Sequence, residues 1–179
     1  LFSKPISGPH KHGHIIEQHL DVMRYIGCPV DKIEFPLPVL TDEMETVTKL
    51  LEEYNVKSPY VVLVPGTRGG RKKWPIESWG TLAKKLAEDK IFCLIAGTPN
   101  EMGMGKTIKK ISPTPYTVNL MGKTTLLELV ALEKKAALHI SGDTGPLHIA
   151  NAVHTPIIAL FGPTLPDRSG PYGNANGYA

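Results

Sequence analysis

The chain has 179 residues, 41% of them hydrophobic and 21% charged, and a formal net charge of +3 at pH 7. This composition is typical of a globular protein, and the lack of an apolar run of about 18 residues argues against a membrane-spanning helix. The small net charge gives no reason to expect a nucleic-acid partner. The sequence begins with Leu1 rather than Met, which we interpret as the sign of a processed product or an excised part of a longer protein.

The first part of the chain is expected to form two helices joined by a linker. Apolar residues at helical spacing over residues 14–26 predict a helix that ends at Gly27. Residues 29–40 contain three prolines and are typical of a linker. Thr41 is expected to be the N-cap of a second helix, whose apolar face runs to Tyr54.

From Tyr60 onward, strands are expected to alternate with helices. The predicted strands are short apolar runs at residues 60–64, 91–96, 116–120, 137–140 and 156–161. The predicted helices cover residues 75–87, 101–111, 126–135 and 144–153. In the third of these helices, Leu126, Leu129 and Val130 are expected to face the core. The alternation predicts βαβ units and therefore an α/β fold with a Rossmann-like, doubly wound parallel sheet.

The two cysteines, Cys28 and Cys93, lie far apart, and neither belongs to a C-x-x-C pair. This pattern favours buried thiols in a reducing compartment over a disulfide. It therefore indicates a cytoplasmic protein.

Ligands of such sheets bind outside the carboxyl ends of the strands, and the first loop expected there covers residues 65–73. Its glycines permit close approach of the backbone to a ligand, and Thr67 can donate a hydrogen bond. Arg68 or Lys72 can neutralise phosphate oxygens. These features favour an anion site over a solvated basic loop. A nucleic-acid patch is disfavoured because interleaved aromatic residues are missing.

The second strand-end loop, residues 97–101, leads into Gly103-Met104-Gly105-Lys106-Thr107, which looks like the end of a Walker A motif. The first position of that motif is Asn100 instead of glycine, and the segment lies inside a predicted helix, which argues against an ATPase. Glu101 can accept hydrogen bonds from a ribose diol. It can equally be an acidic residue favoured at a helix N-terminus, and the sequence leaves both interpretations open.

A third strand-end loop covers residues 120–125, and the fourth lies in the stretch SGDTGPLHIANA, residues 141–152. There Asp143 or Thr144 can cap a helix, and Gly145 leaves the first-turn amides uncovered for an anion. Pro146 suits the first turn, and His148 lies one turn along the same face. A capped turn with a core-packed histidine explains the same residues, so this loop alone does not decide between the two.

Several other sites are disfavoured by the motifs that the sequence lacks. No G-x-G-x-x-G follows a predicted strand and no G-x-S-x-G is present, which argues against a nicotinamide dehydrogenase and a serine hydrolase. His10, His12 and His14 alternate, but nothing nearby completes a ligand set, which favours a polar loop over a metal site. No D-x-D pair is present either, and no metal cofactor is expected.

Four parts of the sequence together resemble one family. They are Pro65-Gly66-Thr67 with Arg71-Lys72-Lys73-Trp74-Pro75, Gly97-Thr98-Pro99-Asn100-Glu101, Asp143-Thr144-Gly145-Pro146-Leu147-His148-Ile149-Ala150, and Leu160-Phe161-Gly162-Pro163-Thr164. Over about residues 14–173 they resemble the heptosyltransferases of lipopolysaccharide core synthesis, glycosyltransferase family nine. The D-T-G-x-x-H element followed by F-G-P-T is the most specific part. The resemblance implies the GT-B fold, in which the C-terminal of two Rossmann-like domains holds the donor sugar nucleotide.

The resemblance also implies a division of the chain. Residues 1–40 would be the last helix of the N-terminal acceptor domain and the linker. Residues 41–179 would be the donor-binding domain, truncated at its C-terminus. The family's catalytic base is a carboxylate early in the N-terminal domain, so it would precede this chain, and the isolated chain is expected to be inactive.

By position in the family's motifs, the resemblance implies a donor site. Its residues would be Thr67, Arg68, Lys72, Glu101, Thr124, Asp143, Thr144, Gly145 and His148. The first three would meet the phosphates and sugar, and Lys72 and Arg68 would stabilise the leaving diphosphate. Glu101 would meet the ribose of an ADP group, and Thr124, where some relatives have Met, would lie by the adenine. The stretch from Asp143 to His148 would hold the sugar and diphosphate.

The implied activity is the inverting transfer of heptose from ADP-heptose to a lipid A/core oligosaccharide. The enzyme would be cytoplasmic and peripheral to the inner membrane, with the membrane contact made through the part that is missing here. Two alternatives remain at this stage. One is another GT-B sugar-nucleotide enzyme, either a transferase with a different donor or a 2-epimerase. The other is a non-catalytic nucleotide-binding module.

Overall fold

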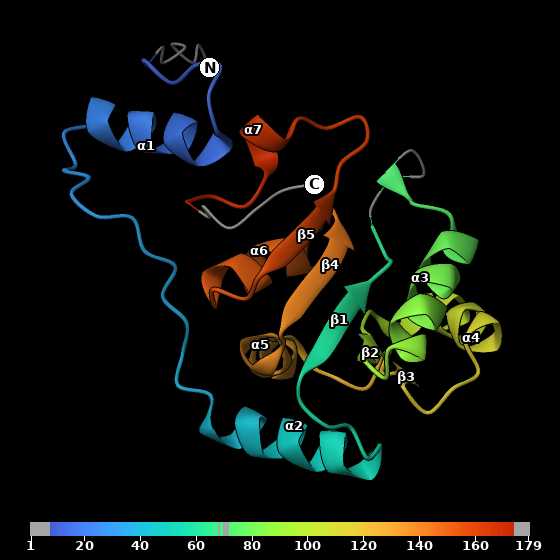
Figure 1. The fold of residues 1–179 in the computed structure, drawn as a ribbon. Coiled ribbons are helices and arrows are strands. Elements are labelled where there is room, and N and C mark those ends of the chain that lie inside the picture. The colour runs from blue at the N-terminus through green and yellow to red at the C-terminus, as the bar shows by residue number, and fades with distance from the viewer. Residues whose placement is uncertain (1–7, 68, 70–71, 174–179) are drawn as a thin grey trace.

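The computed structural model describes residues 8–67, 69 and 72–173, and within them the centre of the fold is a five-stranded sheet (Figure 1). The strands are β1 (Tyr60–Val64), β2 (Phe92–Ile95), β3 (Thr117–Asn119), β4 (Leu138–Gly142) and β5 (Ile157–Leu160). Their spatial order is β3-β2-β1-β4-β5, and every neighbouring pair is parallel. The predicted α/β fold with a parallel, doubly wound sheet is confirmed.

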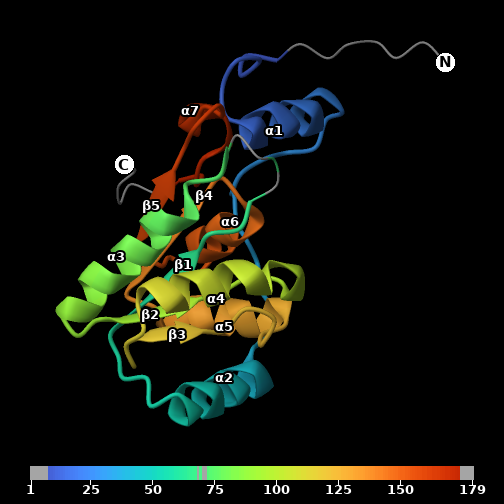
Figure 2. The same ribbon diagram turned by 90° about the vertical axis from the view of Figure 1, so that its right-hand side faces the viewer.

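Helices cover both faces of the sheet, which explains why the strands are apolar runs. They are α2 (Thr41–Glu53), α5 (Leu126–Lys135) and α6 (Gly145–Ala152) on one face, and α3 (Ile76–Glu88) and α4 (Met102–Ile111) on the other. Successive side chains of a strand point to opposite faces. Val62 therefore packs with the α2 and α5 side, whereas Leu63 packs with Trp79 of α3. Figure 2 shows α2 outside α5, as a further layer.

The order of the strands creates a crevice at one end of the sheet. From β1 the sheet grows through β2 to β3 on one side and through β4 to β5 on the other. At such a switch point the loops that follow the two central strands turn away from each other, which leaves room for a ligand at their carboxyl ends. In this chain those loops follow β1 at Val64 and β4 at Gly142.

The N-terminal helix α1 (Ile15–Tyr25) lies apart from the sheet, beside the short helix α7 (Pro166–Ser169), as both views show (Figures 1 and 2). Nε2 of His14 donates a hydrogen bond of 2.9 Å to the carbonyl oxygen of Gly170. Residues 28–40 form no helix or strand, so the predicted helix and linker are both confirmed. Among the described residues, no helix has the length and apolar character needed to cross a membrane.

The structure corrects three details of the predicted elements. Thr41 is not the N-cap of α2: the helix begins at Thr41, and the N-cap is Leu40, which makes no side-chain capping hydrogen bond and is buried in the core. Leu126 does not face the core but is 67% exposed, because it is the first residue of α5, whereas Leu129 and Val130 are buried as predicted. The strand β4 continues to Gly142, since it pairs with β5 along that length.

The two cysteines differ in their surroundings. Neither forms a disulfide, and Cys93 in β2 is buried as predicted. Burial raises the pKa of the Cys93 thiol to about 12. The prediction of burial is wrong for Cys28, which lies at the start of the linker and is only half-buried.

These surroundings predict selective labelling of one thiol. The folded chain should react with Ellman's reagent through Cys28, while Cys93 should react only after denaturation, because thiolate is the reactive form and burial disfavours it. The measurement is the number of thiols titrated with and without urea at about pH 8. As a control, Cys28→Ser should abolish the reaction of the folded chain; rapid labelling of that variant would contradict the buried position of Cys93.

Candidate functional site

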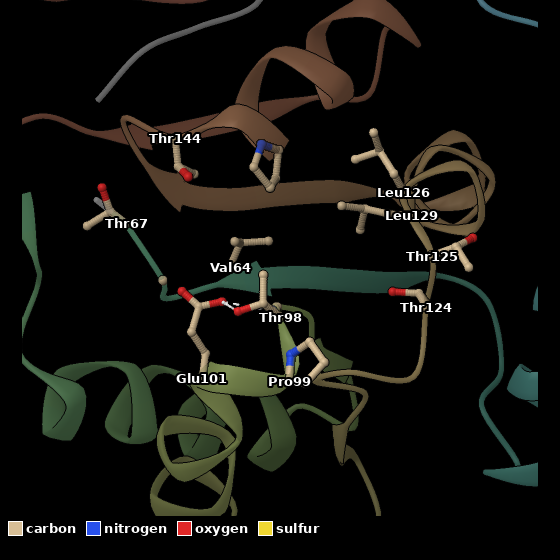
Figure 3. Close-up of a pocket in the computed structure, with 13 residues that line it drawn as sticks. Val64, Thr67, Thr98, Pro99, Glu101, Thr124, Thr125, Leu126, Leu129 and Thr144 are labelled. Atoms are coloured by element: carbon tan, nitrogen blue, oxygen red, sulfur yellow. Dashed lines mark hydrogen bonds between the residues drawn. The ribbon is translucent and has the colours of Figure 1, made fainter. Parts of the chain in front are cut away.

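A pocket of about 510 Å³ lies at the carboxyl ends of the strands, where the sheet order predicts a ligand site (Figure 3). It is lined by Val64, Gly66, Thr67, Gly97, Thr98, Pro99, Glu101, Thr124, Thr125, Leu126, Leu129, Thr144 and Pro146. Figure 3 shows the hydroxyl-bearing Thr67 and Thr144 at one end and Leu126 with Thr124 at the other. The pocket therefore offers a polar end near the switch point and a more apolar end beside α5.

Glu101 is fixed in the wall of this pocket by a capping box. Its Oε2 accepts hydrogen bonds from the backbone N–H and the hydroxyl of Thr98, both at 2.8 Å, at the start of the 3₁₀ turn Pro99–Glu101. Its Oε1 makes no hydrogen bond to the described residues. Glu101 is thus an acidic residue at a helix start, as one interpretation of the sequence has it, and it also lines the pocket. The contact with a ribose diol stays a prediction.

Two glycines make room for that carboxylate. A Cβ on Gly66 would lie 1.9 Å from Oε1 of Glu101, and a Cβ on Gly97 would lie 3.0 Å from Oε2. Real Cβ atoms do not approach an oxygen as closely as the first of these distances, so any side chain at Gly66 must displace Glu101. The two glycines therefore leave the space that one of the chain's own carboxylates occupies.

Asp143 joins the loop after β4 to the loop after β1. Its Oδ2 lies 2.6 Å from Nζ of Lys72, and its backbone oxygen accepts a hydrogen bond of 3.2 Å from the hydroxyl of Thr67. The side chains of Lys72 and Asp143 are 29% and 12% exposed, so the ion pair is partly shielded from water. The two loops therefore meet across the switch point, and Asp143 neutralises the charge of Lys72.

The start of α6 is not capped in the predicted way. Thr144 occupies the N-cap position with an extended backbone, but its side chain makes no capping hydrogen bond, and Asp143 points to Lys72 instead. Thr144 is therefore the N-cap residue, as one of the two predicted candidates, but the capping hydrogen bond expected from its side chain is not made. Pro146 lies in the first turn as predicted and has no N–H, and the N–H of Leu147 donates to the backbone oxygen of Thr144 at 3.2 Å, so the amide of Gly145 remains for an anion.

His148 lies on α6 beyond the pocket lining, with an exposed side chain. Partial loss of solvent around the ring lowers its pKa, the nearby His14 acts in the same direction, and the charge of Asp143 opposes them. The ring is therefore neutral at neutral pH. The alternative of a core-packed histidine is wrong.

The structure gathers four of the predicted donor residues, Thr67, Glu101, Thr124 and Thr144, around one pocket. Asp143 contacts Thr67, and Lys72 contacts Asp143, whereas Gly145 and His148 lie outside the lining. Arg68 lies outside the described residues. The site also contains residues that the prediction missed: Thr98 and the apolar Pro99, Leu126, Leu129 and Pro146. The T-x-x-E spacing from Thr98 to Glu101 signals the capping box, whereas nothing in the sequence marks the apolar wall.

The other segments considered as candidate sites in the sequence have structural roles. The Walker-like segment lies within α4, where Thr107 donates to the carbonyl of Gly103, so it is no phosphate loop. Nδ1 of His10 lies 2.9 Å from Asp21, and Nδ1 of His14 accepts from the backbone of Ile16. Over the described ranges, no group of three or more histidine, cysteine, aspartate or glutamate side chains is arranged to hold a metal ion. The expectation of a metal-free reaction stays a prediction.

Comparison with known proteins gives consistent matches. The family model for glycosyltransferase family 9 (heptosyltransferase) matches residues 3–178. The chain is 30% identical over 168 residues to lipooligosaccharide heptosyltransferase 2 of Haemophilus influenzae, which covers 84% of this chain and 49% of that protein. It is 31% identical over 156 residues to lipopolysaccharide heptosyltransferase 3 of Escherichia coli K12, covering 86% of this chain and 45% of that protein. The chain thus spans about half the length of these relatives.

Solved structures share the fold. A family 9 glycosyl transferase from Veillonella parvula superposes with a TM-score of 0.84 at 19% identity, over 98% of this chain and 51% of that one. An Escherichia coli heptosyltransferase solved with ADP superposes with a TM-score of 0.68 at 24% identity, over 95% of this chain and 50% of that one. The GT-B heptosyltransferases therefore contain a half with this arrangement of strands and helices.

The close approach of Gly66 to Glu101 predicts opposite effects of two glycine substitutions. Gly66→Ala should lower the free energy of unfolding by about 1 to 3 kcal/mol, because the new methyl group overpacks the wall against Glu101. Gly103→Ala is the matched control: nothing lies near its Cβ, and alanine is the better helix former, so stability should rise by about 0.5 to 1 kcal/mol. Urea unfolding measures both, and an unaffected Gly66→Ala variant would show that Glu101 is not fixed at this position.

Proposed function

The chain belongs to glycosyltransferase family 9, and from that membership we propose that it forms the donor-binding part of an inverting glycosyltransferase. The proposed reaction transfers heptose from ADP-heptose to a lipid A/core oligosaccharide in lipopolysaccharide biosynthesis. The observation that carries the proposal is the pocket at the switch point, with a fixed carboxylate in its wall and a cation beside its polar end. A sugar nucleotide has groups that match this pocket: a ribose diol for the carboxylate, an apolar base for the apolar end and a diphosphate for the polar end.

The proposed orientation of the donor follows from the two ends of the pocket. The adenine lies against the apolar Leu126, with Thr124 close by, and the ribose hydroxyls donate to Glu101. The diphosphate then reaches the polar end, where Thr67 and Thr144 present hydroxyl groups. The amide of Gly145 at the start of α6 would face an anion in that position, and the helix dipole favours its negative charge.

Stabilisation of the leaving group is assigned to Lys72 and to the amides of α6 near Gly145. Negative charge grows on the diphosphate as the bond to the sugar breaks, and donors placed beforehand lower the barrier to that step. Asp143 holds Nζ of Lys72 at 2.6 Å, so the cation is already positioned when the donor binds. Arg68 is proposed for the same role on the family pattern alone. The sugar is proposed to extend toward His148, at the solvent side of α6.

We propose that the chain divides at residue 40. Residues 1–40 would be the last helix of the acceptor domain and the linker, and residues 41–179 the donor domain. In support, α1 lies apart from the sheet and carries exposed large hydrophobic side chains, among them Met23 (41% exposed) and Tyr25 (62% exposed). The base that deprotonates the acceptor is assigned to the half of the relatives' length that this chain does not span. The lipid-linked acceptor would bring the enzyme to the cytoplasmic side of the inner membrane as a peripheral protein.

The pocket predicts a preference for one nucleotide. Isothermal titration of the chain with ADP, UDP and GDP should give the tightest binding for ADP. Equal affinities would refute the proposed adenine position. Lys72→Ala should weaken ADP binding by about tenfold or more, because one charge-assisted contact to phosphate is lost, and should leave adenosine binding unchanged. Lys73→Ala, at the exposed neighbouring position, is the matched control and should bind ADP like the unmodified chain.

The lowered pKa of His148 predicts that protons are taken up when the diphosphate binds. The ring is neutral in the unbound chain near pH 7, and an anion beside it favours the protonated form, so the pKa rises on binding. ADP affinity should therefore increase between about pH 7 and pH 6. His148→Gln supplies the reference slope, since the phosphate itself also titrates. If both proteins give the same slope, His148 does not lie beside the diphosphate.

A further inference from the structure

Three polar side chains are buried together beneath the end of β4, outside the donor pocket. Glu133 comes from the last turn of α5, and His139 and Ser141 come from β4. Each of the three residues has 0% of its surface exposed. Oε1 of Glu133 lies 2.7 Å from Nδ1 of His139, and Nε2 of His139 lies 2.8 Å from Oγ of Ser141.

The hydrogen bonds of this group fix where its protons lie. The hydroxyl of Ser141 donates its one proton to the backbone oxygen of Gly142, at 2.9 Å. Oγ must therefore accept the hydrogen bond from His139, which requires a proton on Nε2. Nδ1 and Oε1 then share one further proton, as an imidazolium with a carboxylate or as an imidazole with a carboxylic acid. In both forms the group carries no net charge, as full burial demands.

The chain of hydrogen bonds ends at Gly142, the last residue of β4 that is paired with a neighbouring strand. The register between β4 and β5 ends with Gly142 opposite Leu160. The next residue, Asp143, already belongs to the site, where it contacts Thr67 and Lys72. A bond to the oxygen of Gly142 restrains the peptide plane that connects Gly142 to Asp143, because the peptide group is rigid.

We propose that Glu133, His139 and Ser141 are positioning residues for the donor site: their hydrogen-bonded chain orients the Gly142–Asp143 peptide and so holds the loop before α6 ready for the diphosphate. The part of this inference that concerns binding rests on the proposed function, whereas the part that concerns the loop does not. The three side chains touch no ligand and take no part in the chemistry.

Stability alone gives a poor account of this group. Oε2 of Glu133 is buried and has no hydrogen-bond partner among the described residues, which costs folding free energy. Apolar side chains of similar size often replace buried ion pairs without loss of stability. Tyr60 and Thr155 adjoin the group, and their hydroxyls donate to the backbone oxygens of Leu132 and Glu133. They anchor α5 but do not reach Gly142, so the connection to the loop runs through Ser141 alone among these side chains.

The first test needs no variant. Nitrogen NMR of the histidine rings in the unmodified chain should show a proton on Nε2 of His139. An unprotonated Nε2 would overturn the proposal, because the chain of hydrogen bonds could not then run from Glu133 to Gly142.

The second test compares Ser141→Ala with Thr155→Val, which removes a different buried hydroxyl at the same group. Ser141→Ala should speed amide hydrogen exchange at Leu147, whose N–H donates to the backbone oxygen of Thr144 in this loop, by about tenfold and weaken ADP binding by a similar factor, since one buried hydrogen bond is lost. Amides of β1 and β2 should exchange as before. Thr155→Val should lower stability but change neither the exchange of the loop nor ADP affinity. Equal loop exchange in the two variants would overturn the proposal.

A third comparison separates hydrogen bonding from packing and also covers a failure of Ser141→Ala to fold. Glu133→Gln keeps a donor for Nδ1 and should retain the slow amide exchange of Leu147 and the ADP affinity, whereas Glu133→Leu should lose both. If Glu133→Leu retains both, the chain of hydrogen bonds does not position the loop. If the unmodified chain binds no ADP, the proposed function fails, and the exchange measurements still decide whether the loop is positioned in this way.

Discussion

The site depends on the contact that Asp143 makes across the switch point of the sheet. The loops after β1 and β4 leave neighbouring strands and turn in opposite directions, so no ladder of backbone hydrogen bonds joins them. Asp143 supplies the missing connection through two different groups, its carboxylate to Lys72 and its backbone oxygen to Thr67. Without it, the crevice would be bordered by two unconnected loops, and the polar end of the pocket would have no fixed width.

This contact also decides the electrostatics of the site. With its charge neutralised by Asp143, Lys72 brings little net positive charge to the pocket before a ligand arrives. Among the described residues, the positive end of α6 near Gly145, whose amide no threonine or aspartate side chain caps, then contributes most of the positive potential at this end of the pocket. Because the ion pair is partly shielded, water competes less with Asp143 for the ammonium group of Lys72. Lys72 is therefore held in place rather than sampling the solvent. The ion pair thus weakens the attraction of Lys72 for an anion but gives its ammonium group a defined position.

The sequence predicts the fold and the location of the site well, and the reasons are physical. The pattern of apolar residues identifies a buried strand such as β1 without knowledge of its neighbours. The switch point of a parallel sheet then places the loop with Thr67 and the loop with Thr144 at the same edge of the sheet. What the sequence leaves out are contacts between distant residues. It shows Lys72 as a cation and Asp143 as a cap, but not that they neutralise each other. It likewise gives no sign that His139, inside an apolar run, bonds to a glutamate on another element.

Helix α6 connects Tyr172 and α1 with the pocket at the switch point. Its Asn151 donates a hydrogen bond of 2.9 Å to the backbone oxygen of Tyr172, whose hydroxyl in turn donates to Glu17 of α1. The ring of Tyr172 lies 4.9 Å from that of His14, which also lowers the pKa of His148. The first turn of the same helix forms part of the pocket wall. The same short helix therefore links α1, through Tyr172 and Asn151, to the wall of the pocket.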